Sequence, residues 1–294
     1  MLAKVGKFHP LVFIVIPIHN GLDHTKNCLS DIQKLKYPNV RTIVVDDGSD
    51  DGSSEYIGAR HPDITVLKGD GQLWWSGAVN RGIEHALKNK ADYICLLNND
   101  NRFEADFLGR LVQTSVEKAT ECVCSKVLNQ YSHNVFFAGG TVNAIGELRM
   151  FQGEDGPDLN RQREIIWTGG MGVLFKREIF ESTGLFDEKN FPQYFGDADF
   201  SFRLRKNGYK ILYEPKSVVF NDTRSTGHSY KSGTWSDLCR TLFSIKSHLN
   251  PYISAKFYFR HTPMTAPLIL VKRCVRIFGG FLKAAIHRSA TPTS

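Results

Sequence analysis

The feature that most constrains the fold of this chain is the alternation of short apolar segments with helix-like segments over residues 11–128. Strand candidates lie at 11–16, 41–45, 64–67 and 93–97, and segments of helical length separate them. Short, continuously apolar strands joined through helices are typical of a parallel sheet that is covered on both faces. The sequence therefore predicts an α/β fold in which helices flank a mainly parallel sheet.

The remaining elements follow from the same patterns. Within 11–128 we expect helices at 23–35, 53–59, 77–88 and 103–118, and a short strand at 122–125. Over 129–175, clusters of Gly interrupt short apolar segments, which predicts hairpins or an inserted loop with strands at 134–137 and 164–167. Beyond this region the sequence predicts strands at 173–175, 210–213 and 217–220, helices at 177–181 and 199–206, and a polar loop at 221–233.

The net charge of +7 belongs to the C-terminal part of the chain. No Asp or Glu follows Asp237, whereas nine Lys and Arg residues do, which leaves 28 basic against 30 acidic residues elsewhere. A nucleic-acid-binding protein would spread basic charge over its binding groove. The distribution argues against nucleic acid as a partner and favours a local contact between the C-terminal segment and an anionic partner.

The C-terminal segment 268–287 predicts an amphipathic helix that begins after Pro267 and is interrupted at Gly279-Gly280. Apolar side chains fill one side, and an arc about 100° wide on the other side holds the cations Lys272, Arg273, Arg276, Lys283 and His287. Such a helix can lie in an anionic membrane surface with its apolar side down. The alternative is packing on the domain or on a second subunit, which would give a homodimer.

Two observations bear on the compartment. The six cysteines are scattered, without the paired spacing of a metal site, which predicts reduced thiols in a cytosolic protein. The apolar run 11–18 is too short to span a membrane. We therefore expect a cytoplasmic protein, with peripheral contact to the inner face of the cytoplasmic membrane if the C-terminal helix binds lipid.

Acidic side chains follow two of the predicted strands. Asp46 and Asp47 come directly after the strand 41–45, and Asp100 follows 93–97 within Asn98-Asn99-Asp100. In parallel sheets ligands bind beyond the carboxyl ends of the strands. A carboxylate beside a diphosphate is what Mg²⁺ or Mn²⁺ requires. The alternatives are a plain Asp-Gly turn for the first pair and a helix N-cap for Asp100.

Two further residues are candidates for the site. Asp197, in Asp197-Ala198-Asp199, precedes a predicted helix and is interpreted either as a helix cap or as a general base. Two neighbouring carboxylates raise one another's pKa, which would keep one of them basic. Trp75 lies between Gly71 and Gly77, where it would either pack in the core or line a sugar or base pocket.

Together these segments resemble the family 2 glycosyltransferases with a GT-A fold. The similarity covers roughly residues 11–220. Its segments, in the family's order and spacing, are IPIHN at 16–20, VDDGS at 45–49, GAVNRG at 77–82, LLNND at 96–100, GGMG at 169–172, GLFDE at 184–188, GDADF at 196–200, and RL and GY within 203–209. The resemblance implies a GT-A (Rossmann-like) domain over 1–235. This domain would comprise a nucleotide-binding half at about 11–128 and an acceptor or catalytic half at about 129–235, followed by a basic helical extension at 236–294.

The resemblance also implies roles for individual residues. Asp197 matches the catalytic base and Asp100 the metal-binding acid, with Mn²⁺ or Mg²⁺ as the cofactor. Pro17, Asn20, Asp46 and Asp47 would hold the nucleoside. The wider set expected to bind the nucleotide sugar also contains Trp75, Gly77, Asn80, Asn99 and Gly170.

The sequence departs from the family pattern in three places. The metal motif keeps a single acid, Gly196 stands where the family often has Glu before its base, and Asn221 stands where many members have His. The nearest histidine is His228, which we include as a candidate metal ligand. The Gln/Arg-x-x-Arg-Trp motif of processive members is absent from the sequence, which implies transfer of one sugar per encounter.

The sequence thus predicts a metal-dependent, inverting glycosyltransferase that moves a sugar from a nucleotide-sugar donor to a hydroxyl of a glycan or lipid-linked glycan. By family analogy alone, the expected pathway is synthesis of a bacterial cell-surface glycan, such as O-antigen, capsule or a lipid-linked precursor. The alternative is a non-catalytic nucleotide-sugar-binding protein, which would keep Asp46, Asp47 and Asp100 but need not keep Asp197. A nucleotidyltransferase would have a Gly-rich loop after the first strand, where this chain has Pro17 to Asn20.

Overall fold

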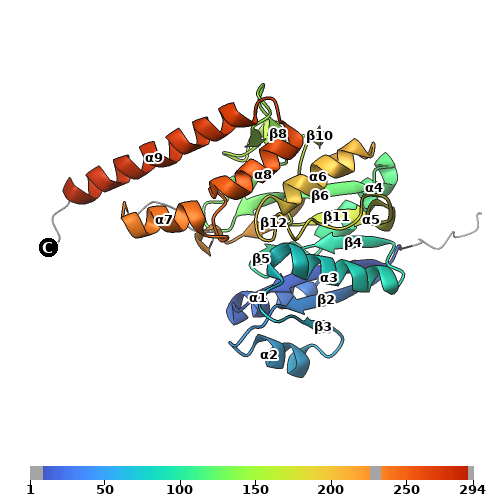
Figure 1. Cartoon of the computed structure of the whole chain (residues 1–294). Helices are drawn as coiled ribbons and strands as arrows, with labels where there is room; N and C mark the ends of the chain where they lie inside the picture. The colour runs from blue at the N-terminus through green and yellow to red at the C-terminus, as the bar shows by residue number, and fades with distance from the viewer. Residues whose placement is uncertain (1–8, 226–232, 291–294) are drawn as a thin grey trace, which may run out of the picture.

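The computed structural model describes residues 9–225 and 233–290 of the 294-residue chain (Figure 1). Its central sheet runs in the order β10-β12-β6-β11-β4-β1-β2-β3, with β5 paired to β12 and β7 paired to β6. A separate hairpin is made of β8 and β9. The strands are β1 (Val12–Ile18), β2 (Val40–Asp46), β3 (Thr65–Lys68), β4 (Tyr93–Leu96), β5 (Asn101–Phe103), β6 (Cys122–Asn129), β7 (Val135–Phe137), β8 (Gly140–Val142), β9 (Leu148–Met150), β10 (Arg163–Ile165), β11 (Val173–Lys176) and β12 (Ile211–Asn221).

The sheet is mainly parallel, as the sequence predicts. Strands β3, β2, β1 and β4 pair with one another in parallel, whereas β11 is antiparallel to both β4 and β6. Along β1, Phe13 and Val15 enter one apolar cluster and Val12, Ile14 and Ile16 enter another. Successive side chains of a strand point to opposite faces, so a strand that is covered on both faces must be apolar throughout.

The helices in the described part of the chain cover both faces of the sheet and form the C-terminal extension (Figure 1). They are α1 (Leu22–Ile32), α2 (Ser53–Arg60), α3 (Trp74–Lys88), α4 (Phe107–Lys118), α5 (Arg177–Thr183), α6 (Gly196–Lys206), α7 (Trp235–Phe243), α8 (Pro251–His261) and α9 (Ala266–Ala290). None of them combines the length and the hydropathy that a membrane span requires.

Three predictions about elements were wrong. The helix expected at 103–118 begins at Phe107, because Asn101–Phe103 pairs with β12 as the short strand β5. The strands expected at 210–213 and 217–220 are one strand, β12, whose pairing with β6 is irregular between Glu214 and Val218. Helix α9 runs through Gly279-Gly280 without interruption.

The extension contains two helices that the sequence analysis did not identify. Asn250 caps α8 by accepting hydrogen bonds from the backbone N–H groups of Tyr252 and Ile253, and Pro251 occupies the first turn, which suits both residues. Phe257 of α8 and Ile269 of α9 are fully buried in a cluster that also contains Ala198 of α6. The extension therefore packs directly on the half of the domain that carries Asp197.

Candidate active site

The carboxylates of Asp46, the last residue of β2, and of Asp47, which follows it, are buried and already hydrogen-bonded within the protein. Asp46 accepts hydrogen bonds from the backbone N–H of Ser49 (2.9 Å) and from the hydroxyl of Ser54. Asp47 accepts from the backbone N–H groups of Gly71 (2.8 Å) and Trp74 (3.0 Å). Because Gly71 lies between β3 and α3 and Trp74 is the first residue of α3, Asp47 fixes the start of α3 against the end of β2.

The residues after β1 contact the same turn. Asn20 has a left-handed backbone (φ 61°), its N–H donates to Ser49 Oγ (2.8 Å), and its side-chain oxygen accepts from the N–H of Asp50 (3.0 Å). Pro17 pairs opposite Val45 in the sheet. The predicted nucleoside residues Pro17, Asn20, Asp46 and Asp47 are thus brought together at the ends of β1 and β2.

Gly77 and Asn80 lie on α3, which begins at Trp74, three residues earlier than predicted. The amide of Asn80 donates to Phe186 O (2.9 Å) and Glu188 Oε2 (2.7 Å) and accepts from the N–H of Phe186 (2.9 Å). A Cβ at Gly77 would lie 3.4 Å from Glu188 Oε2. The contacts observed for Asn80 are therefore structural, and they fasten the segment around Phe186 to α3.

Trp75 connects three parts of the site. Its indole N–H donates to Asn98 Oδ1 (2.9 Å), and its ring meets Phe186 edge-on with centroids 5.4 Å apart. A Cβ at Gly170 would overlap the Trp75 ring, so this close approach requires glycine. Trp75, Gly169, Gly170 and Asp197 line one small pocket, so the ring both packs against the core and faces the site.

Asp100 is half-buried beyond the end of β4. Burial raises its pKa to about 6, with a smaller raising effect from Asp222 and an opposing effect from His24. Asn101 joins the ends of two strands, because its amide N–H group donates to Asp100 Oδ1 (3.2 Å) and to Asn221 Oδ1 (2.8 Å). Asn99 instead donates to Thr25 Oγ1 (3.1 Å), on α1.

Asp222 was not predicted as a site residue. The available signal was its position directly after the end of β12, the strand that pairs with β5 beside Asp100. Its carboxylate also accepts from Tyr131 Oη (2.7 Å) and from Arg224 Nη2 (3.0 Å). His228, the other predicted metal ligand, lies outside the described residues.

The oxygen atoms around Asp100 suit a hard divalent cation that takes its remaining ligands from a substrate. Within residues 9–225 and 233–290, no group of three or more His, Cys, Asp or Glu side chains is arranged to hold a metal by itself. Asp100 contributes a carboxylate, with Asp222 near enough to affect its pKa. Mg²⁺ and Mn²⁺ prefer oxygen ligands, and Mg²⁺ sites typically use one or two carboxylates, with phosphate oxygens and water for the rest.

Asp197 lies in the first turn of α6 and faces the pocket beside Trp75. A Cβ at Gly169 would lie 3.6 Å from Asp197 Oδ2. Burial raises the pKa of Asp197 to about 6, and the Ala198 N–H, which donates to Oδ1 (2.8 Å), partly opposes that rise. Asp197 is not the N-cap residue of α6, which is Phe195, although its carboxylate does accept the first-turn N–H of Ala198.

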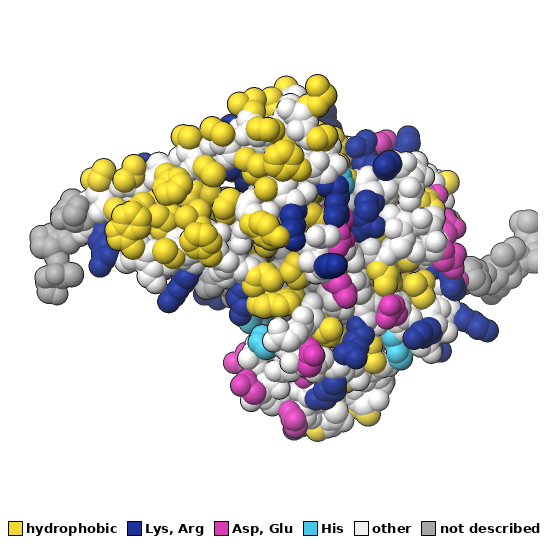
Figure 2. All heavy atoms as spheres, in the orientation of Figure 1, with side chains coloured by type: hydrophobic (Ala, Val, Ile, Leu, Met, Phe, Trp, Pro, Cys, Tyr) yellow, Lys and Arg dark blue, Asp and Glu magenta, His cyan; other side chains and the backbone are white. Residues whose placement is uncertain are grey.

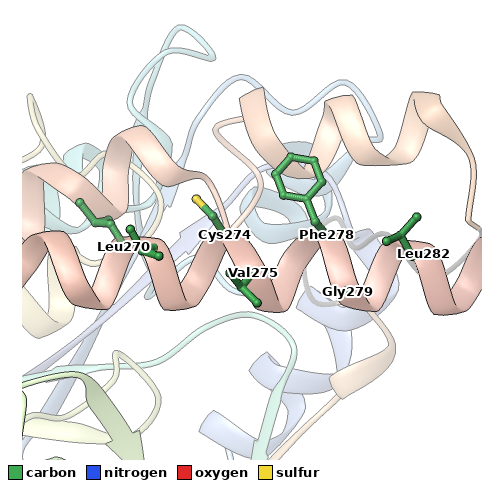
Figure 3. A pocket seen from close by; sticks show the side chains of 7 residues that line it. Leu270, Cys274, Val275, Phe278, Gly279 and Leu282 are labelled. Carbon is green, nitrogen blue, oxygen red and sulfur yellow. The ribbon is translucent and has the colours of Figure 1, made fainter.

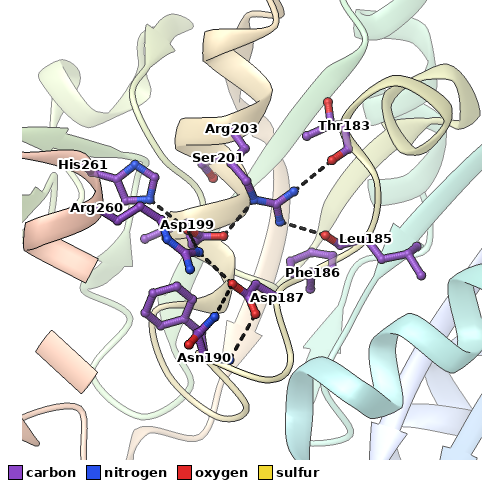
Figure 4. Close-up of polar contacts among 12 residues, drawn as sticks. Thr183, Leu185, Phe186, Asp187, Asn190, Asp199, Ser201, Arg203, Arg260 and His261 are labelled. Carbon is purple, nitrogen blue, oxygen red and sulfur yellow. Dashed lines mark hydrogen bonds and ion pairs between the residues drawn. The ribbon is translucent and has the colours of Figure 1, made fainter. Parts of the chain in front are cut away.

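Asp199 does not raise the pKa of Asp197, contrary to our expectation. Its side chain is fully buried and accepts from Arg203 Nε (2.9 Å), Arg260 Nη1 (2.9 Å) and His261 Nε2 (2.8 Å) (Figure 4). Although burial alone would raise it, these hydrogen bonds hold the pKa of Asp199 below its usual value. Its charge is thus balanced by the cations around it, and the basic character of Asp197 comes from burial.

The cluster around Asp199 joins α6 to the C-terminal extension. Arg260 of α8 also binds Asp187 Oδ2 (2.8 Å), while Arg203 donates to the carbonyls of Thr183 (2.9 Å) and Leu185 (2.8 Å) (Figure 4). Asp199 stands two residues after Asp197 on α6. The cluster therefore fixes the helix that presents Asp197, relative to both α8 and the segment after α5.

Replacing Arg260 with methionine should lower the free energy of unfolding by about 1–3 kcal/mol, because buried Asp199 loses one of its three partners. Urea-induced unfolding followed by circular dichroism measures the change. Lys256→Met is the matched control on α8. Lys256 lies over the Tyr252 ring, so its replacement removes no partner from Asp199. An equal loss of unfolding free energy in both variants would show that Arg260 stabilises the fold no more than Lys256 does.

The comparisons with known proteins agree with this geometry. The sequence model of the family described as "Glycosyl transferase family 2" matches residues 13–184. The chain is 30% identical to "Glycosyltransferase GlyG" of Streptococcus pneumoniae, over 40% of each protein. It is 22% identical to the "N-acetylglucosaminyl-diphospho-decaprenol L-rhamnosyltransferase" of Mycobacterium tuberculosis, over 69% of this chain and 74% of that one. The chain spans 14% to 40% of the length of three curated relatives, GlyG among them.

A solved structure shares the fold. It is the mannosyltransferase PcManGT from Pyrobaculum calidifontis in complex with GDP-Man and Mn²⁺, with a TM-score of 0.61 and 18% identity over 98% of this chain and 77% of that one. This similarity supports the GT-A architecture predicted from the sequence. Since the family model covers more than half of the 294 residues, the chain belongs to glycosyl transferase family 2.

Proposed function

We propose that this chain is a metal-dependent, inverting glycosyltransferase that moves one sugar per encounter from a nucleotide-sugar donor to an acceptor hydroxyl. One observation carries the proposal: Asp197, a carboxyl group of raised pKa, lines the same pocket as Trp75. The Trp75 indole is in turn hydrogen-bonded to Asn98, two residues before Asp100. Asp197 would thus act as the base for the acceptor, and Asp100 would hold the metal for the donor.

In the proposed reaction, the Asp197 carboxylate accepts the proton of the acceptor hydroxyl while that oxygen attacks the anomeric carbon. The bond from the anomeric carbon to the diphosphate oxygen breaks, its electron pair leaves with the diphosphate, and the configuration inverts. Asp100, with Asp222 beside it, would hold Mn²⁺ or Mg²⁺, which offsets negative charge on the leaving diphosphate. The residues at the ends of β1 and β2 would orient the nucleoside.

The pKa values predict how activity depends on pH. A general base must be ionised, and burial raises the pKa of Asp197 to about 6. Turnover at saturating donor and metal should therefore rise about tenfold per pH unit below pH 6 and level off above it. A profile of kcat between pH 4.5 and 8, checked for intact folding at each pH, measures this limb. Turnover that stays constant down to pH 4.5 would contradict the assignment of Asp197 as the base.

The substrate classes are proposed from relatives. The mycobacterial relative is named for a diphospho-decaprenol-linked acceptor, and the structural neighbours are complexes with GDP-Man and Mn²⁺ or with UDP, GalNAc and Mn²⁺. We infer a nucleoside diphosphate sugar as the donor. A glycan or lipid-linked glycan of a bacterial cell surface is the acceptor that we propose.

A panel of UDP, GDP and dTDP sugars tests the proposed activity. We expect the full chain to release nucleoside diphosphate slowly from one donor class in Mn²⁺, and to release none in excess chelator. Binding of a donor without release or transfer would instead favour the alternative, a nucleotide-sugar-binding protein. The raised pKa of Asp197 in the pocket favours catalysis, because a binding protein has no use for a base there.

A further inference from the structure

Exposed apolar side chains gather on the C-terminal extension, on one side of the molecule (Figure 2). Six of them lie along α9, each at least 46% exposed: Leu268, Val271, Val275, Phe278, Leu282 and Ile286. Trp235 and Phe243 of α7 are 73% and 76% exposed, and Tyr252 and Phe259 of α8 are 67% and 53% exposed. We call this surface of α7, α8 and α9 the apolar platform. A large contiguous area of exposed apolar side chains marks an interaction site in soluble proteins.

The other sides of α9 are already occupied by the protein. Ile269, Ile277 and Phe281 are buried, at most 4% exposed. Lys272 and Arg276 both pair with buried Glu147 (2.9 Å each). Lys272 and Arg276 thus anchor α9 to the domain through Glu147, while their side chains remain 43% and 49% exposed.

The part of the platform on α9 is a continuous apolar strip along the helix. Residues of α9 alone line a shallow apolar hollow there, with Leu270, Cys274, Phe278 and Leu282 placed in succession along the helix (Figure 3). Figure 1 shows α9 extending beyond the sheet, so the distal half of this strip has no part of the central domain over it. Within the described residues, Leu268, Val271, Val275, Phe278 and Leu282 of this strip remain 46% to 67% exposed.

The charges around the platform indicate the chemistry of what covers it. No Asp or Glu follows Asp237, and the exposed Lys283, Arg240 and Lys246 belong to this segment. Lys and Arg side chains border the apolar area in Figure 2. An apolar strip with a cationic border suits an interface of acyl chains and anionic headgroups. Two copies joined through the platform would instead bring like charges together, with no acid of the segment 238–294 to pair them.

We propose that the platform docks on an anionic lipid surface, with α9 lying in the plane of that surface. The proposal depends on the platform alone and not on the transferase activity. Its geometry has a consequence for the site, because α8 carries both exposed Phe259 and the Arg260 that binds Asp199 on α6. Docking would thus hold the Asp197 pocket at a defined height beside a lipid-linked acceptor.

Vesicle co-sedimentation of the full chain tests the proposal. The probes are vesicles of phosphatidylglycerol with phosphatidylethanolamine, and vesicles of phosphatidylcholine alone. We expect binding to the anionic vesicles at low salt, weaker binding as the salt concentration rises, and little binding to phosphatidylcholine. Lys283→Gln should reduce the partition coefficient about fivefold.

The decisive comparison uses matched apolar positions. Val275 on the platform is 67% exposed and Val116 on α4 is 62% exposed. Val275→Glu should reduce vesicle binding about tenfold or more, whereas Val116→Glu should leave it unchanged. Both positions are exposed, so both variants should fold and keep the wild-type release of nucleoside diphosphate from the donor. That readout separates failure of docking from failure of the proposed activity.

Three outcomes would overturn the proposal. The wild-type chain could ignore anionic vesicles at low salt, or Val275→Glu could bind them as well as the wild type. In the third, sedimentation velocity would show a dimer without vesicles that Val275→Glu dissociates, while vesicle binding is absent. That result would assign the platform to a second copy of the chain.

Discussion

Replacing Asp197 with asparagine should cut turnover by roughly 10²–10⁴-fold and leave donor binding nearly unchanged, as expected for loss of a positioned proton acceptor. Asparagine has nearly the same shape as aspartate but cannot accept a proton at neutral pH. Its side-chain oxygen can still accept the Ala198 N–H, which now bonds to Asp197 Oδ1. Kinetics of sugar transfer or donor hydrolysis, at saturating Mn²⁺, measure the effect as a loss of kcat without a rise in KM.

The matched control is Asp158→Asn, which changes an exposed aspartate in the short 3₁₀ turn Pro157–Asn160. This variant should keep wild-type turnover. Near wild-type turnover of Asp197→Asn itself would remove the base from the mechanism, and the pocket beside Trp75 would then have another purpose.

Replacing Asp100 with alanine should cost several kcal/mol of transition-state stabilisation, which corresponds to about 10²-fold or more in kcat/KM. The loss should appear mainly as weaker Mn²⁺-dependent donor binding. Excess chelator should abolish activity of the wild type. Activity assays at increasing Mn²⁺ concentration measure both effects, and full wild-type activity in chelator would contradict a metal-dependent reaction.

The same change should not destabilise the fold. Burial raises the pKa of Asp100 to about 6, so the folded state binds a proton more tightly than the unfolded state does. The stability of the folded state therefore falls as the pH rises from about 4 to 6, and at pH 7 the ionised Asp100 carboxylate lowers the free energy of unfolding. Asp100→Ala should thus unfold at the same urea concentration as the wild type or a higher one. A large loss of stability would mean that Asp100 supports the structure rather than a metal.

The centre of the sheet was predictable because β1, β4 and most of β2 are apolar. Strands β1, β2 and β4 are buried on both faces, and this leaves a run of apolar residues that local sequence reveals. The strand β5 was not predictable in this way. Asn101–Phe103 has only three residues, and its partner β12 lies more than a hundred positions later, so its strand conformation comes from the tertiary structure.

The candidate site was predictable where it rests on strand ends and family motifs. Asp46, Asp47, Asp100 and Asp197 all occur in such segments, and the structure places the first three at one edge of the sheet. Three features of the site could be seen only in the folded structure. Asp222 approaches Asp100 through the pairing of β5 with β12, and the amide of Asn80 forms hydrogen bonds within the protein. The carboxylate of Asp199 is balanced by Arg203 of α6 and Arg260 of α8.

The orientation of α9 also needed the fold. Periodicity identified an amphipathic helix, but it could not show which side faces the protein. Glu147, which lies more than a hundred residues earlier, pairs with Lys272 and Arg276 and fixes the rotation of α9 on the domain, while both cations remain partly exposed. The exposed strip is consequently the apolar side, bordered by the remaining cations.

The central claim is that Asp100 holds a metal for the donor diphosphate while Asp197 acts separately on the acceptor. Calorimetric titration of the preferred nucleotide sugar into wild type, Asp197→Asn and Asp100→Ala tests it most directly, with Mn²⁺ and with chelator. We expect equal, Mn²⁺-dependent binding by wild type and Asp197→Asn, and weak binding by Asp100→Ala under both conditions. Equal donor affinity of all three proteins, with or without Mn²⁺, would contradict it.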